Sequence, residues 1–387
     1  AEILGLPWET AVKTYRRELS TQSYPHVQDY AINFLRFLES HGGLFPTDRK
    51  EGFGFDEIQT IFGSIRSTFY DGVKKVLTGQ SKLEVEEPEE LLAAIVDANH
   101  EKAKTMRVFE LADGSPWPAN YVRDIEKEYL PTIRSLRDKI FSDLPLDSVH
   151  KKRLTEIGKF TLSRTVGATG YTGLVIAGYG TEDFYPSLSA VEVYGNLNGR
   201  LRFVYNRTKG ADIHADRGAA IVPFAQSEMV TTFMEGVDPS YQETVTDAVA
   251  TALASVATEL LDALGSGQAD DIRDSVTDTI VRGVLNELHT NLTAERWKYF
   301  VSPVLSVVAA LPKTELASMA ESLVNLTSMK RHVSSVSETV GGPIDVALIS
   351  KGDGFVWIKR KHYFNKDLNY HFFANYFRGG GIDEEKQ

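Results

Sequence analysis

Hydrophobic side chains recur with the period of an α-helix through most of the first 160 residues. Pro7 suits the first turn of a helix, because its ring presets the backbone there. The pattern behind it predicts helices at residues 8–19, 27–38, 55–77, 89–104 and 121–159, the last with a break at Pro145. Gly52 and Gly54 are interpreted as turn residues, and the charged residues around them predict a loop over 41–54.

After residue 170, short apolar runs between turn residues predict strands. They lie at 172–177, 187–194, 201–205, 218–222, 346–349 and 355–358. We expect turns at 195–199 and at Gly352-Asp353-Gly354, each closing a hairpin. Apolar residues fill 174–180 and 346–349 without alternation, so we expect both strands to be buried on both faces. Helices are predicted between the two sets of strands, at 227–234, 244–264, 270–289, 294–311 and 314–329. This order indicates a layered α/β or α+β fold.

The bulk composition is that of a globular protein and narrows the choice of function. A chain of 387 residues can form one large domain or two ordinary ones. The formal charge of −11 argues against a nucleic-acid-binding face, and no apolar run approaches the roughly 20 residues that span a bilayer. The absence of Cys excludes disulfides and thiolate chemistry. We expect a cytoplasmic protein that binds neither nucleic acid nor membrane.

Candidate chemistry is sparse. No Gly-x-Ser-x-Gly turn follows a strand, and the nine His residues lack metal-site spacings, so we predict no metal and no cofactor. The basic run 359–362 fits a phosphate or acidic partner or, as we favour, a charged strand end that protects a sheet edge. The acidic cluster from Glu84 to Glu90 fits a solvated linker that enters a helix N-terminus. Core packing is the favoured role of the Ala-rich helix 244–264, whose Val249, Leu253, Val256, Leu260 and Leu264 share one face; a partner helix is the alternative.

Two stretches carry short motifs in a characteristic order. In the first, a strand ends in Ile176-Ala177-Gly178-Tyr179 and the next opens with Pro186-Ser187-Leu188, before small residues at 219–222 and a helix at 228–236. In the second, a helix with Glu315-Leu316-Ala317 precedes Val340-Gly341-Gly342-Pro343 and a strand. This order resembles that of the proteasome-like N-terminal nucleophile (Ntn) hydrolases, including HslV and the bacterial Anbu group. Residues 1–19 resemble the entry of an early strand of that fold into its first helix.

The resemblance implies an α+β fold, built as a four-layer αββα sandwich with large helical insertions. One proteasome-like domain would span 1–377, with insertions near 39–170 and 237–311, and 378–387 would be a disordered tail. Four residues would lie at turns near the cleft, where glycine permits a close backbone approach. They are Gly178, Tyr179, Gly341 and Gly342. Their expected role is structural, and no catalytic residue is assigned.

The chain departs from the family at positions that carry its chemistry. In the family, a Thr, Ser or Cys becomes residue one by processing and its own α-amino group acts as the base; this chain begins at Ala1. The family's Gly-Ser-Gly is replaced by Val222-Pro223-Phe224, and its Arg-Asp pair is absent at Val336-Ser337. The early strands that hold the family's Asp and Lys would also precede Ala1.

Two main hypotheses follow. The first is a homo-oligomeric proteasome-like amidohydrolase for peptide or other amide bonds, with a nucleophile roughly 40 to 60 residues before Ala1 if the missing strands have ordinary lengths. The alternative is a non-catalytic Ntn-fold protein that serves in binding or assembly, since a fold alone does not give a function. A helical scaffold with an unrelated sheet is a third possibility.

Overall fold

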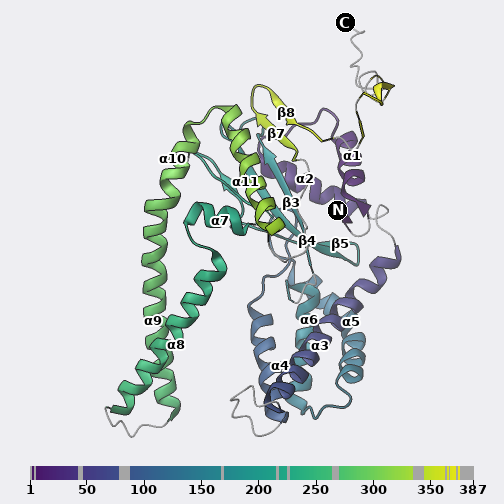
Figure 1. Ribbon diagram of the computed structural model, residues 1–387. Helices are drawn as coiled ribbons and strands as arrows, with labels where there is room; N and C mark the ends of the chain where they lie inside the picture. Colours follow the sequence, from purple (N-terminus) through teal and green to yellow (C-terminus); the bar gives the residue numbers. More distant parts are fainter. Residues whose placement is uncertain are drawn as a thin grey trace. The chain divides into compact units, whose positions relative to one another are not determined.

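The structure is a computed structural model that describes residues 2–3, 6–41, 47–77, 88–166, 170–214, 218–224, 227–263, 270–333, 344–361, 364–365, 367–371 and 374. The chain divides into two compact units, Ala1–Asp212 and Ile213–Gln387. Both helices and antiparallel strands occur in each unit, so the fold is mixed α+β (Figure 1). The expected single domain over 1–377 stays a prediction, and the two units are described separately below.

The first unit is built around an antiparallel sheet of four strands. Its order is β3 (Thr172–Gly178), β4 (Ser187–Leu197) and β5 (Arg200–Tyr205), and β6 (Ala211–Asp212) pairs with the start of β4. The turn between β4 and β5 consists of Asn198 and Gly199, both with positive φ, which is typical of two-residue hairpins. A short ribbon of β1 (Glu2–Ile3) and β2 (Leu6–Pro7) leads into the first helix.

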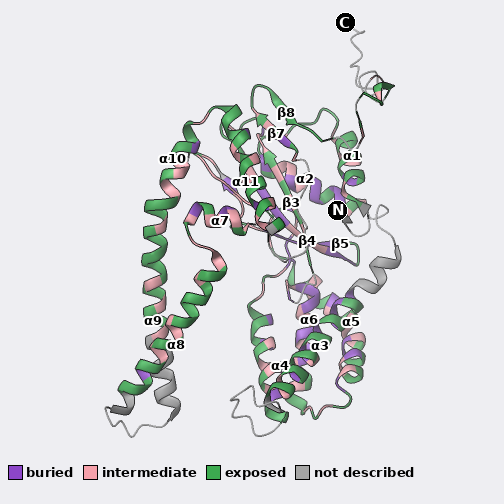
Figure 2. Cartoon of the chain, in the orientation of Figure 1, coloured by how far each residue is buried: buried purple, intermediate pink, exposed green. Residues whose placement is uncertain are grey.

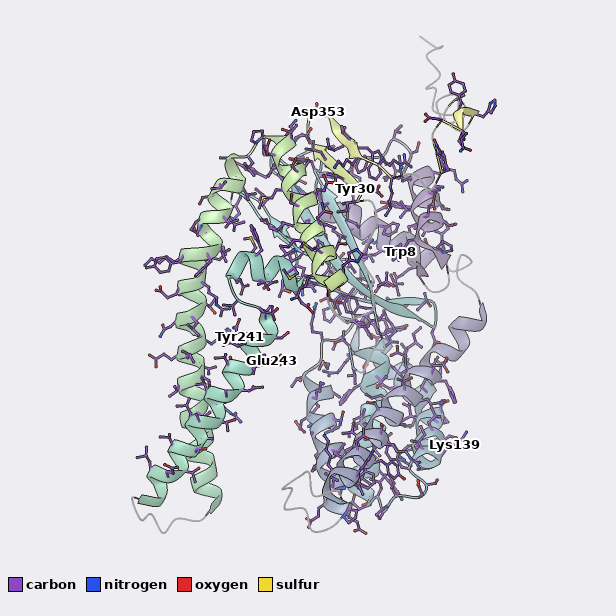
Figure 3. The ribbon with its side chains drawn as sticks, in the orientation of Figure 1. Trp8, Tyr30, Lys139, Tyr241, Glu243 and Asp353 are labelled. Atoms are coloured by element: carbon purple, nitrogen blue, oxygen red, sulfur yellow. The ribbon has the colours of Figure 1, made fainter. Side chains whose placement is uncertain are left out.

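One face of this sheet is covered by α2 (Val27–Ser40), and α1 (Trp8–Leu19) packs against α2. The α2 side chains Phe34, Leu35 and Leu38 are buried against alternate residues of β4 and β5, including Val193 and Phe203. Trp8 lies at the start of α1 and stacks on Phe34, with ring centroids 6.3 Å apart (Figure 3). The apolar face that the 3.6-residue period predicted for α2 is therefore the face that meets the sheet, and that of α1 packs on α2.

A bundle of four helices supplies the other core of the first unit. They are α3 (Thr47–Leu77), α4 (Pro88–Thr105), α5 (Ala119–Ile140) and α6 (Ser148–Ser163). Phe62 on α3, Ile133 on α5 and Leu154 on α6 are fully buried in this core, which also takes in Leu197 and Val204 from the sheet (Figure 2). Asp147 caps α6 by accepting a hydrogen bond from the His150 amide at 2.7 Å.

The second unit consists of helices and one hairpin. Its helices are α7 (Glu228–Glu235), α8 (Pro239–Ala263), α9 (Asp270–Arg296), α10 (Ser302–Ala310) and α11 (Lys313–Val333). A π-helical turn, η2 (Trp297–Val301), joins α9 to α10. The strands β7 (Val346–Ser350) and β8 (Gly354–Lys359) form an antiparallel pair, and β7 contacts α11.

Several elements differ from the sequence-based expectations. The predicted loop 41–54 is wrong from Thr47 onward, because α3 begins there. Gly54 is buried in this helix where a Cβ would lie 2.6 Å from the Tyr129 ring, so it serves close packing and not a turn. The predicted turn 195–199 is shorter, because β4 continues to Leu197 through a bulge near Gly195. Residues 218–222 do not form a strand.

The prediction that two strands are buried on both faces is also wrong. In β3 and β7 burial alternates along the strand, so that Val175 and Ile349 are exposed. All six residues of β8 are exposed. Apolar residues on both faces therefore do not mean that both faces are covered within one unit. The tail 378–387 lies outside the described residues, as do Val336-Ser337 and most of the acidic cluster.

Candidate functional site

The turn after β3 contains two of the residues singled out in the sequence, Gly178 and Tyr179. Gly178 ends the strand with a φ of 149°, a value that favours glycine, and Tyr179 is half-buried. At the next position a Cβ on Gly180 would lie 1.9 Å from the Pro25 carbonyl oxygen. The turn is therefore pressed directly against the segment that precedes α2.

Hydrogen bonds fasten this turn to the start of α2. Asp183 accepts from the Gly180 amide at 2.7 Å and from the Val27 amide at 3.2 Å, and its other oxygen lies 2.7 Å from His26 Nδ1. The Thr181 amide donates to the Tyr24 carbonyl at 2.9 Å. We call this arrangement of residues 24–27 and 180–183 the turn clip.

The electrostatics of the turn clip are those of an ion pair. The hydrogen bond with Asp183 raises the pKa of His26, although partial desolvation opposes it. Burial raises the pKa of Asp183, but the hydrogen bonds from His26, Gly180 and Val27 outweigh it, so that the net pKa lies below its usual range. An Asp whose oxygens already accept these hydrogen bonds holds the two segments together. It does not resemble a base aimed at a nucleophile.

A pocket in the second unit is a candidate for ligand binding. Residues 220–224 run beside α7, α10 and α11 and enclose a volume of about 450 Å³ with them. Its lining is Ala220, Ile221, Val222, Pro223, Phe224, Val230, Val308, Leu316, Met319, Ala320, Leu323, Val324 and Thr327. Only Thr327 in this lining has a polar side chain, and its hydroxyl donates to the Leu323 carbonyl at 3.0 Å. This apolar pocket has the size of a small-molecule or side-chain site.

A smaller cavity of about 180 Å³ shares Ala220, Ile221, Pro223 and Val230 with the first. It is lined by residues of 220–223, α7, η2 and α10, and Glu235 is the one charged residue in the lining. The Glu235 carboxylate is 3.1 Å from Arg296 Nη1, so its charge is already balanced at the end of α9. Segment 220–223 thus contributes to both cavities, and only the larger one has a lining without a charged residue.

A buried ion pair lies in the core of the first unit. Arg202 on β5 is 0% exposed, and its Nη2 lies 3.3 Å from Glu57 Oε2 on α3 and 2.8 Å from the Thr161 carbonyl oxygen. The guanidinium also stacks 4.6 Å above the ring of Phe109. Burial lowers the pKa of Arg202 and raises that of Glu57, and each charge opposes the shift of the other. This pair joins the sheet to the helical bundle.

Other predicted positions give no further site. Gly341, Gly342 and His362 lie outside the described residues. Across the parts of the chain that the structure describes, no cluster of three His, Asp or Glu residues could hold a metal ion, and no helix there is both long and apolar enough to cross a membrane. In the basic run, Lys359 Nζ lies 2.6 Å from Glu321 on α11 and Arg360 lies over the Trp357 ring, as favoured for a charged strand end.

Sequence reasoning located the turn clip only in part and missed the apolar pocket. The Gly178-Tyr179 motif pointed to the turn, but nothing in the pattern linked Asp183 to His26, which is 157 residues away. The run Ala220 to Phe224 was a usable signal for the pocket, although it predicted a strand. Comparison with known proteins adds nothing to these sites, because no family model, no curated protein and no solved structure matches this chain.

Proposed function

We propose that this chain is part of a proteasome-like Ntn amidohydrolase that cleaves peptide amide bonds beside an apolar side chain. The fold would be the four-layer αββα sandwich, with the sheet β3–β4–β5 and its covering pair α1–α2 as one sheet and one helical layer. The nucleophile, a Thr, Ser or Cys with its own α-amino group as base, would come from residues that precede Ala1.

The apolar pocket is the observation that carries this proposal. The family resemblance places Val222-Pro223-Phe224 where the family's Gly-Ser-Gly contributes to the oxyanion region, and Ala220 to Phe224 and Val230 of the following helix line the pocket. A volume of about 450 Å³ accepts a Leu, Phe or Tyr side chain with room to spare. Apolar walls without a charged group favour such a side chain over Lys, Arg, Asp or Glu, because a charge placed there would lose its water.

The test uses the protein expressed from its natural gene. Intact mass and N-terminal sequencing should reveal a processed Thr, Ser or Cys, and fluorogenic peptides with Leu or Phe before the scissile amide should be cleaved. Replacement of the processed residue by Ala should abolish cleavage. A native chain without such a terminus, or one whose cleavage survives its replacement, would refute the amidohydrolase.

Filling the pocket tests the specificity separately. Ala320→Phe places a ring in the lining and should lower kcat/KM for the Leu and Phe peptides at least tenfold. Ser322→Phe adds the same ring to α11 at an exposed position outside the lining, and it should leave kcat/KM within twofold. Equal effects of the two variants would show that the pocket does not bind the substrate side chain.

A second candidate function is peptide binding without hydrolysis. The observation that favours it is Pro223, which stands within the segment that replaces the family's Gly-Ser-Gly and has no backbone N–H. A proline there cannot donate to the oxyanion of an amide-hydrolysis intermediate. On this proposal the same Leu and Phe peptides bind to the native chain at equilibrium and are recovered intact, and Ala320→Phe weakens their binding. Turnover of the peptides would exclude this second function.

A further inference from the structure

The helical hairpin formed by α8 and α9 leaves its larger apolar side chains exposed. The two helices contact each other, and in α8 Ala257 is buried while Ala250 and Ala254 are half-buried. The prediction that the Val and Leu face of α8 packs in the core is wrong for Val256 and Leu260, which are 52% and 59% exposed. The better covered side of α8 thus carries alanines, and these two larger side chains lie outside it. Most of the hairpin's described surface is exposed in Figure 2.

The larger exposed apolar residues of α8 form a stripe along one side of the helix, as one pair near its start and one near its end. Tyr241, Val245, Val256 and Leu260 are separated by four, eleven and four positions. At 3.6 residues per turn they fall within an arc of about 100°. Tyr241 extends from the first turn of the helix at 67% exposure (Figure 3), and Leu292 on α9 is exposed as well. An apolar stripe of this length matches the face of a second amphipathic helix.

The charge of the hairpin is strongly negative. Residues 239–296 contain ten Asp and Glu against three Arg, so they carry −7 of the chain's formal −11. Glu243, Asp247, Glu259, Glu287 and Glu295 are all exposed. Two hairpins of this charge would repel each other, which disfavours a second copy of this chain as the occupant of the stripe. A helix that carries Lys or Arg beside its apolar face would instead be attracted.

We propose that the α8–α9 hairpin is a docking surface for a basic amphipathic helix of a partner protein. The stripe Tyr241, Val245, Val256 and Leu260 buries the apolar face of that helix, and the carboxylates of the hairpin attract its Lys and Arg side chains. This surface shares no residue with the apolar pocket and does not depend on the proposed amide hydrolysis.

The experiment titrates the full chain with a fluorescein-labelled 20-residue peptide of Leu and Lys in helical register. Fluorescence anisotropy should report binding that weakens as NaCl rises from 50 to 500 mM, because salt screens exposed charges. Two control peptides are used. One has the same Leu and Lys composition in scrambled order, and the other has Glu in place of Lys. Both should bind at least tenfold more weakly than the first peptide. If the scrambled peptide bound equally well, binding would result from non-specific charge attraction alone, and the proposal would be overturned.

Variants of the hairpin locate the site. Val256→Ser combined with Leu260→Ser should weaken binding at least tenfold, whereas Val149→Ser, which removes an equally exposed valine from α6, should not change it. Glu259→Gln removes an exposed carboxylate at the edge of the stripe and should weaken binding and flatten its salt dependence, with helicity unchanged by circular dichroism. Binding unaffected by these variants would overturn the proposal. So would sedimentation that shows self-association abolished by the Val256 and Leu260 changes, because the occupant would then be a second copy.

Discussion

The buried pair of Arg202 and Glu57 makes a sharp prediction about the stability of the first unit. Glu57→Gln removes the carboxylate and leaves the guanidinium in a site from which water is excluded. Removing one partner of a buried ion pair costs roughly 3 to 5 kcal/mol. The Gln amide oxygen can still accept one hydrogen bond from Arg202, and the Thr161 carbonyl keeps its own at 2.8 Å. We therefore expect a loss of about 3 kcal/mol in the free energy of unfolding.

The double variant Glu57→Leu with Arg202→Met separates charge from packing. Both replacements are apolar and of similar length, so no unpaired charge remains in the core. Such exchanges are often neutral, or stabilising by about 1 to 4 kcal/mol. The double variant should consequently be more stable than Glu57→Gln, although it changes more atoms.

Urea unfolding followed by tryptophan fluorescence measures both variants. Trp117 is buried beside Phe109, with ring centroids 5.4 Å apart, so its emission shifts to longer wavelength when this core opens. Trp297 and Trp357 in the second unit are already exposed and contribute little to that shift. A Glu57→Gln protein within about 1 kcal/mol of the parent, or a double variant less stable than the single one, would refute the reasoning.

Two further predictions concern the turn clip. The pKa of His26 is raised in the folded protein, so its stabilising effect is complete below pH 6.5, the ordinary pKa of histidine, and is lost as the pH rises through the folded-state pKa. The pKa of Asp183 is lowered, so its stabilising effect is complete above pH 3.8, the ordinary pKa of aspartate, and is lost as the pH falls through the folded-state pKa. The protection factor of the Gly180 amide in hydrogen exchange should therefore be largest between these limits. His26→Gln should remove the loss on the alkaline side and reduce the loss on the acid side, because the His26 hydrogen bond also lowers the pKa of Asp183; a protection factor that rises above pH 7 would contradict this. Gly180→Ala should lower the free energy of unfolding in urea by roughly 1 to 3 kcal/mol, because the added Cβ meets the Pro25 carbonyl. Gly173→Ala is the control and should leave this free energy unchanged, because the space around Gly173 is open. Equal losses in the two variants would show that the close approach to Pro25 does not cause the destabilisation.

The sequence predicted helices well where a polar face and an apolar face alternate over many turns. The helices α1 and α2 begin as expected because Phe34 and Leu38 lie on the side of α2 that meets the sheet, and Trp8 of α1 packs on Phe34. The pattern failed at Gly54, since glycine signals a turn locally but here makes room for Tyr129 from another helix. It also failed at Ala220 to Phe224, where an apolar run packs beside helices without pairing as a strand.

The candidate sites were less predictable for a related reason. The Gly178-Tyr179 motif identified a turn, but the hydrogen bonds of Asp183 depend on the position of residues 24–27 in the folded chain. The apolar pocket depends on the packing of α7, α10 and α11 around a short segment, and no local pattern encodes such an arrangement. Periodicity predicted that the exposed stripe of α8 packs in the core, because the pattern shows that a face is apolar and does not show what covers it.

The pairing of α2 with the sheet has a consequence during synthesis. Gln28 accepts its hydrogen bond from Ser189, which follows it by 161 residues in the chain. At about 5 to 20 residues per second, the ribosome needs on the order of 8 to 30 s to supply that strand. The bundle α3–α6 can assemble in the interval, because its helices are close together in the chain. The apolar faces of α1 and α2 meanwhile have no sheet to cover, so chaperones that bind exposed apolar segments should meet the nascent chain there first.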